Sequence, residues 1–253
     1  QDPMAANTTM KPYDVLAIGA HPDDVEVGCG GTLIELTERG KRCALAILTE
    51  GEMGTGGDRD IRRREIDTAA HIMGADIAAL FDWGDTQLAD TFEHRLELGQ
   101  IIRNLRPRII LCPWPQVFHG RRQSHPDHVA AGQITINAAN IANLRKAPIQ
   151  GDIHLVTRIF HYFLPPNVPP TIVVDITPHY ERWMQALAAH QSQFLNPQKG
   201  KDYMESLSIM AKSFGALARV KYGQGFTTAE PAVVRDITTL ADPHPTEASR
   251  RLA

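Results

Sequence analysis

Short apolar runs alternate with segments of helical periodicity over the first half of this chain. The apolar runs lie at residues 15–18, 43–48, 77–81 and 108–112. Strands that are buried on both faces of a parallel sheet have this composition. Helices are expected between the runs, at residues 32–39, 58–73 and 92–105. The alternation predicts a three-layer α/β/α, Rossmann-like fold with a mostly parallel sheet.

Residues that begin and end helices mark the same boundaries. Gly40 and Gly74 follow the first two expected helices, and glycine is common just after a helix ends. Asp58 is a candidate N-cap of the second helix. Ser124 is a candidate N-cap of a further helix that begins at Pro126, because proline is tolerated at the first helical position.

The second half of the chain is less regular. Strands are expected at residues 159–164 and 171–176, where the neighbouring prolines favour a turn or an exposed edge strand. Helices are expected at residues 180–194 and 204–220. These elements complete the predicted fold.

We expect one domain over residues 4–230, because a chain of 253 residues can bury a single sizeable core. Residues 231–253 are interpreted as a peripheral or flexible tail. The three residues before Met4 are interpreted as a cloning or protease-cleavage remnant.

Composition excludes several classes of partner. The net charge is −3 with both signs interspersed, which gives no strong field for nucleic acid or an anionic membrane. No apolar run approaches the roughly 20 residues that span a bilayer, and no signal peptide is recognisable. The three cysteines, Cys29, Cys43 and Cys112, form neither a disulfide framework nor a cysteine-based zinc site. These features predict a cytoplasmic protein.

The first strand is followed directly by the sequence His-Pro-Asp-Asp at residues 21–24. In open α/β sheets, ligands bind at the carboxyl ends of the strands. Asp23 and Asp24 would repel each other if both were buried and charged, and a divalent cation removes that repulsion. One carboxylate can then bind the metal while the other accepts a proton from a bound water.

A second cluster, His-Pro-Asp-His, occupies residues 125–128. Because His125 and His128 are three residues apart, both can face the same side of a first helical turn. Either one can bind the metal while the other lies near the substrate as a proton donor. With His21 and Asp24, one of these histidines gives three protein ligands and an open position, which is typical of a catalytic zinc site. A single His-Pro-Asp is an ordinary turn, but two clusters favour the metal site.

The chain resembles the zinc-dependent LmbE-like, or PIG-L, N-acetylglucosaminyl deacetylases. The resemblance spans roughly residues 12–230 and rests on an ordered set of motifs. They lie at residues 21–24, 28–32, 49–55 and 125–128, with Arg62 and Glu65, and at residues 192–194 and 222–226. The last two motifs are similar to those of the bacillithiol-type branch, so the chain is expected to be closest to that branch.

The resemblance implies a role for each residue that matches a family motif. The metal ligands would be His21, Asp24 and His128. Asp23 would be the general base, and His125 the acid, oriented by Asp127. Arg62 would contact the substrate and Tyr222 would stabilise the oxyanion. The cofactor would be Zn²⁺, or another divalent metal such as Fe²⁺.

The resemblance also implies a substrate class and an assembly. The substrate would be an N-acetylglucosamine conjugate, with N-acetylglucosaminyl-malate as the first expectation. Another N-acetylglucosamine derivative or a chitooligosaccharide is the alternative. Relatives of this kind form trimers or hexamers, so a homo-oligomer is expected. Gln224 and the glycine-rich loop at residues 54–57 depart from the family pattern.

Two other functions stay open at this point. A nucleotide-binding protein would use residues 28–31 as a glycine-rich turn, but two carboxylates nearby would repel a phosphate. A carbohydrate-binding protein without activity would lack catalytic residues, and all of them are present. Asp85, Trp83 and Trp114 are candidate sugar contacts, with turn capping or packing as the alternative. His190 and Arg158 are weaker site candidates.

Overall fold

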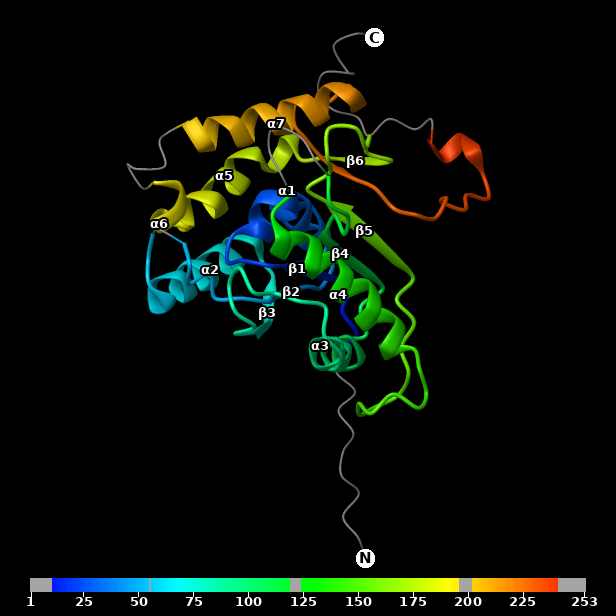
Figure 1. Cartoon of the computed structure of the whole chain (residues 1–253). Coiled ribbons are helices and arrows are strands. Elements are labelled where there is room, and N and C mark those ends of the chain that lie inside the picture. The colour runs from blue at the N-terminus through cyan, green and yellow to red at the C-terminus, as the bar shows by residue number, and fades with distance from the viewer. Residues whose placement is uncertain (1–10, 55, 119–123, 196–201, 241–253) are drawn as a thin grey trace, which may run out of the picture.

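The computed structural model describes residues 11–54, 56–118, 124–195 and 202–240. Its main sheet has five parallel strands in the order β3-β2-β1-β4-β5 (Figure 1). The strands are β1 (Val15–Gly19), β2 (Cys43–Ile47), β3 (Asp76–Leu80), β4 (Ile109–Pro113) and β5 (Arg158–Tyr162). The predicted α/β fold with a parallel sheet is confirmed.

Helices cover both faces of this sheet (Figure 1). They are α1 (Asp24–Glu38), α2 (Arg59–Met73), α3 (Phe92–Leu105), α4 (Pro126–Ala142), α5 (Tyr180–Ala189), α6 (Gln191–Phe194) and α7 (Asp202–Ala218). Leu16 and Ile18 pack with α3 and α4, whereas Val15 and Ala17 belong to the core formed with α1, α2 and α5. Successive side chains of a strand point to opposite faces, so one short apolar run supplies both cores.

A second, two-stranded antiparallel sheet lies beside the main one. It pairs β6 (Ile172–Asp175) with β7 (Gly223–Phe226). Strand β7 was not expected from the sequence, because its two glycines hide the strand pattern. Two short 3₁₀ helices, η1 (Thr177–His179) and η2 (Ile237–Leu240), complete the described elements. Residues 1–10 and 241–253, with the expected remnant and the end of the tail, lie outside the described residues.

The prediction that the first helix begins at residue 32 was wrong. Helix α1 begins at Asp24, and its glycines lie inside the helix rather than in a turn. A Cβ atom on Gly28 would overlap the ring of Tyr162, and one on Gly31 would lie 2.9 Å from Ile176. These glycines let α1 approach β5 and the segment after β6 closely, a tertiary reason that local propensity does not contain.

The remaining helix ends follow the sequence signals with two exceptions. Asp58 caps α2 by accepting a hydrogen bond from the backbone of Ile61 (2.8 Å), and Gly74 ends that helix at φ 72°. Helix α4 begins at Pro126 as expected, but His125 is its N-cap rather than Ser124. The expected helix at 180–194 is interrupted at His190, which separates α5 from α6.

Among the residues that the structure describes, no helix has both the length and the apolar character needed to cross a bilayer.

Candidate metal centre

Four loops meet at the carboxyl edge of the main sheet. The loop after β1 carries His21 and leads into α1, whose first residue is Asp24. The loop after β4 leads into α4, which begins next to His125. The loops after β2 and β3 contact each other, since Asp85 in the loop after β3 accepts a hydrogen bond from the backbone of Met53 in the loop after β2. The fold thus brings segments that are distant in sequence to one place.

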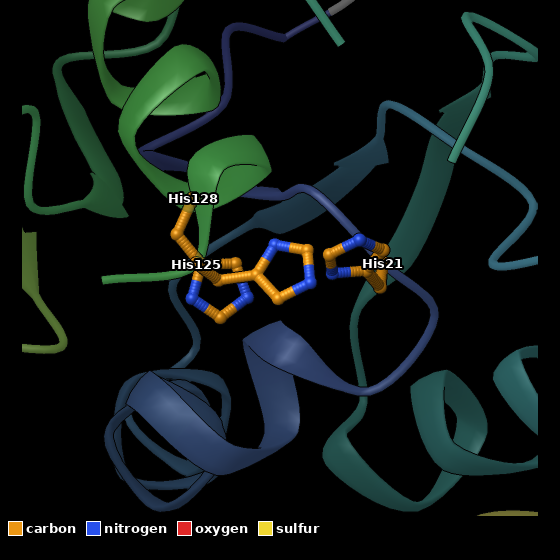
Figure 2. Close-up of side chains that lie close together, drawn as sticks. All are labelled: His21, His125 and His128. Atoms are coloured by element: carbon orange, nitrogen blue, oxygen red, sulfur yellow. The ribbon is translucent and has the colours of Figure 1, made fainter. Parts of the chain in front are cut away.

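Three imidazoles lie close together at this edge. Figure 2 shows the rings of His125 and His128, from the start of α4, beside the ring of His21. The ring centroids of His21 and His128 are 5.4 Å apart, and those of His21 and His125 are 4.7 Å apart. One nitrogen from each ring lies within 4.8 Å of the others, an arrangement that can hold a metal ion. The predicted convergence of the two His-Pro-Asp clusters is therefore present in the structure.

Asp24 lies between two of these histidines. Its Oδ1 is 3.0 Å from Nε2 of His128, and its Oδ2 is 3.3 Å from Nδ1 of His21. The same Oδ2 accepts a hydrogen bond from the backbone N–H of His21 (2.8 Å). Burial acts to raise the pKa of Asp24, but the charges of His128 and His21 hold it well below its ordinary value. Asp24 therefore stays ionised and can serve as a ligand.

Three carboxylates surround the ring of His21 and favour a positive charge on it. Burial opposes a charge on this ring, but Asp24, Asp127 and Asp85 together raise the pKa of His21 to about 11. A metal ion that binds the ring takes the place of that proton.

Asp23 lies beside this cluster in an unusual backbone conformation. Its φ of 156° is outside the range that L-residues commonly adopt, and such strain is concentrated at functional sites. Burial and the neighbouring Asp24 raise the pKa of Asp23 to about 6, although Arg62, His190 and His21 act in the opposite direction. A carboxylate with this pKa is mostly ionised at neutral pH and can still accept a proton.

Arg62 lies beneath the loops rather than at their surface. Its side chain is buried and donates hydrogen bonds to the carbonyl oxygens of Gly51 (2.7 Å) and Pro22 (3.1 Å). Its Nη2 is 3.8 Å from Oδ1 of Asp23. The guanidinium therefore joins the loop after β2 to the loop after β1, and its charge faces the candidate base.

Asp127 contacts a different histidine from the one expected. The sequence interpretation gave it the orientation of His125, but its Oδ2 lies 3.1 Å from Nε2 of His21 and accepts from the backbone of Thr86 (2.7 Å). The link to His125 is made by the backbone, because the N–H of Asp127 donates to Nδ1 of that ring (3.3 Å). Burial, with the nearby His21 and His128, lowers the pKa of His125.

The donor set fits a borderline divalent metal. Two imidazoles and a carboxylate are the ligand types of catalytic zinc sites, and they also suit Fe²⁺. Within the described residues, Oδ1 of Asp127 is buried without a hydrogen-bond partner, so the cluster carries more acceptor capacity than its protein donors satisfy. The cluster of His21, His125 and His128, with Asp24 between two of them, could hold such a metal.

The profile of the GlcNAc-PI de-N-acetylase family, PIG-L, matches residues 16–139. Diacetylchitobiose deacetylase of Thermococcus kodakarensis is 35% identical over 83% of this chain and 81% of its own length. This chain belongs to the PIG-L family.

Two further proteins are similar to this chain. A probable N-acetyl-alpha-D-glucosaminyl L-malate deacetylase 2 of Bacillus cereus is 29% identical over 71% of this chain and 83% of its own length. The expectation that the bacillithiol branch is nearest was therefore wrong, since the chitobiose deacetylase is more similar. The crystal structure of the conserved protein TT1542 from Thermus thermophilus has a TM-score of 0.79 and 36% identity, covering 89% of this chain and 98% of that one.

The structure does not bring every expected PIG-L site residue to the cluster. Tyr222, expected at the oxyanion, is buried in the core cluster that includes residues of α1, α5 and α7, and its ring stacks on Tyr180 with a centroid distance of 3.7 Å. The side chain of Gln224 accepts hydrogen bonds from the backbone (2.8 Å) and hydroxyl (2.9 Å) of Thr32 in α1. Arg158 donates to the carbonyl oxygens of residues 230 and 231. The contacts of these three residues are thus with the core, with α1 and with the chain after β7.

Two residues have a larger part in the site than the sequence indicated. Asp85, interpreted as a sugar contact or a turn cap, lies against His21. His190 is completely buried with its Nε2 3.2 Å from the carboxylate of Glu26 in α1. Although burial acts to lower it, Glu26, Asp23 and Glu65 raise the pKa of His190. The only sequence signal for Asp85 was its place after the third strand.

Proposed function

We propose that this protein is a metal-dependent deacetylase that removes the N-acetyl group from an N-acetylglucosamine derivative. The observation that carries the proposal is the convergence of His21, Asp24 and His128 beside the carboxylate of Asp23. Membership of the PIG-L family supports the reaction class. The metal would be Zn²⁺ or another divalent ion such as Fe²⁺.

The metal, when bound, supplies a Lewis acid that polarises the acetyl carbonyl and lowers the pKa of water. Asp23 accepts a proton from the attacking water, because its pKa of about 6 leaves it ionised at neutral pH. The water oxygen then bonds to the carbonyl carbon. The C–N bond breaks, and the products are acetate and the free amine.

His125 would give the departing amine its proton. The backbone N–H of Asp127 donates to Nδ1 of His125, so the neutral ring carries its proton on Nε2. Because its pKa is lowered, the ring is neutral at pH 7, and it has to receive the proton first lost by the attacking water before it can protonate the amine. Arg62 holds the loops on either side of Asp23 and balances its charge. Direct contact of Arg62 with the substrate, as the family resemblance implies, is part of the proposal.

A chitooligosaccharide such as diacetylchitobiose is the substrate class we favour, because the deacetylase named for it is 35% identical to this chain. N-acetylglucosaminyl-malate is the second candidate, supported by the 29% identical relative from Bacillus cereus. We also propose that the chain forms a homo-oligomer, a trimer or a hexamer. Apart from other copies of the chain, the proposed partner is the small-molecule amino-sugar substrate.

An acetate-release assay tests the function. The protein is stripped of metal, reloaded with Zn²⁺ or Fe²⁺, and incubated with diacetylchitobiose, N-acetylglucosaminyl-malate and N-acetylglucosamine. The proposal expects metal-dependent acetate release with the highest kcat/KM for diacetylchitobiose. If kcat/KM is highest for the malate conjugate, that conjugate and not diacetylchitobiose is the preferred substrate. No release from any of the three by the metal-loaded protein would contradict the proposed function.

A further inference from the structure

The two ring nitrogens of His21 face different groups. Nδ1 lies on the side of Asp24, at 3.3 Å from its Oδ2. Nε2 lies on the other side, 3.2 Å from Oδ1 of Asp85 and 3.1 Å from Oδ2 of Asp127. If Asp24 and His21 bind the same metal ion, the nitrogen that faces Asp24 must be the ligand. The proton of the neutral ring must then be on Nε2.

The carboxylate of Asp85 is held in place from several directions. Its Oδ2 accepts a hydrogen bond from the backbone of Met53 (3.0 Å), and its own backbone N–H donates to Oε1 of Glu52 (2.8 Å). The side chain is buried, with a relative exposure of 7%. One oxygen is thus occupied by the loop after β2, and the other is directed at His21. Neither is turned outward toward a substrate.

Asp127 alone does not account for this arrangement. Its Oδ2, the atom that contacts His21, also accepts from the backbone N–H of Thr86 at 2.7 Å. The oxygen is therefore shared between two donors. Asp85 adds a second acceptor for the proton on Nε2, and burial strengthens charge-assisted hydrogen bonds of this kind.

We propose that Asp85 is a positioning residue that, together with Asp127, keeps the His21 proton on Nε2 and presents the lone pair of Nδ1 to the metal. The inference rests on the metal site of the proposed function. Metal-binding histidines commonly donate their second ring N–H to a carboxylate, which fixes the tautomer and the ring orientation. Because Asp85 is also bonded to Met53, the loop after β2 contributes to the position of the ring.

The affinity of the metal-free protein for Zn²⁺ tests this role without an activity assay. Asp85→Asn and Asp85→Ala are titrated with Zn²⁺ against a chromophoric chelator. Loss of an outer carboxylate typically weakens metal binding about 10–100-fold. We expect a loss in this range for Asp85→Ala and a smaller loss for Asp85→Asn, because the amide oxygen can still accept a hydrogen bond.

Asp82→Asn is the matched control. Asp82 lies in the same loop, is half exposed and pairs with Arg59 rather than with the cluster. This variant should bind Zn²⁺ as the wild type does. Asp85 variants that bind Zn²⁺ with wild-type affinity and lose only activity would overturn the proposal and assign Asp85 to the substrate.

A measurement on the wild type covers the case in which the Asp85 variants do not fold. The ¹⁵N chemical shifts of the His21 ring in the Zn²⁺-loaded protein report which nitrogen carries the proton. The proposal expects the proton on Nε2 and the metal on Nδ1, and the reverse assignment would overturn it. Failure of the proposed function can be told apart from failure of this proposal. In that case the Zn²⁺ affinities and the ¹⁵N shifts would be as expected, but the metal-loaded protein would release no acetate.

Discussion

Nε2 of His128, in the first turn of α4, lies 3.0 Å from Oδ1 of Asp24, the first residue of α1. Parallel strands β1 and β4 are neighbours in the sheet, so their carboxyl ends deliver these two segments to one point. This pairing is the geometric basis of the candidate metal site.

Replacing the two histidines of the second cluster should have different effects on metal binding. His128→Ala removes a candidate ligand and should leave the dialysed protein with little bound Zn²⁺. His125→Ala should keep its metal and lose activity, because His125 is assigned to the proton transfer. Metal analysis of both variants by mass spectrometry checks this. Equal metal content in the two variants would contradict the assignment of His128.

Gly28→Ala should destabilise the protein, because the new Cβ would overlap the buried ring of Tyr162. Overpacking of this kind costs about 1–3 kcal/mol or more in the free energy of unfolding. Gly99→Ala in α3 is the matched control, since its Cβ would meet its neighbours at an ordinary 3.4 Å. That variant should be neutral or gain up to about 1 kcal/mol from helix propensity. Urea unfolding measures both, and a stable Gly28→Ala would disprove the close packing of α1 on β5.

Arg62→Lys should lower both stability and activity. A lysine cannot reproduce the two guanidinium hydrogen bonds to Gly51 and Pro22, and buried carbonyl groups that lose their donors cost about 1–3 kcal/mol. The loops that hold Asp23 would then lose their common anchor. We expect a reduced kcat along with any rise in KM. An increase in KM with unchanged kcat would instead show that Arg62 acts only in substrate binding.

The buried thiols predict a pH dependence of reactivity and stability. Burial raises the pKa of Cys29 and Cys112 well above the ordinary value of 9.0, and that of Cys43 to about 12. The native protein should therefore react slowly with a disulfide reagent at pH 8, and rapidly in urea. Above about pH 9 the unfolded chain loses thiol protons first, so the free energy of unfolding should fall as the pH rises. Fast reaction of the native protein would contradict the burial.

Local sequence signals predicted the strands other than β7, and most helix ends, because these depend on neighbouring residues. The caps and stops at Asp58 and Gly74 are examples. The start of α1 was not predictable in the same way, since Gly28 and Gly31 serve contacts with Tyr162 and Ile176, which are distant in sequence. The propensity of glycine for turns pointed to the wrong structure there.

The candidate site shows the same division. The two short motifs indicated His21, Asp24 and one of the histidines at 125 and 128, because a metal needs several ligands of defined type, and the choice of His128 came from the family resemblance. The partners of those ligands were not identified. Asp127 was matched with its neighbour in sequence rather than with His21, and Tyr222 was placed at the site although it stacks on Tyr180. Such contacts depend on the packing of the loops and helices.

The Asp23→Asn variant gives the most direct test of the central claim. Asparagine keeps the size of the side chain and removes its ability to accept the proton. Metal content and acetate release from diacetylchitobiose are measured for the variant and the wild type under the same conditions. The account predicts about one metal ion per chain in both proteins and a loss of about 10²–10⁴-fold in kcat for the variant. Acetate release by the variant at the wild-type rate would contradict it.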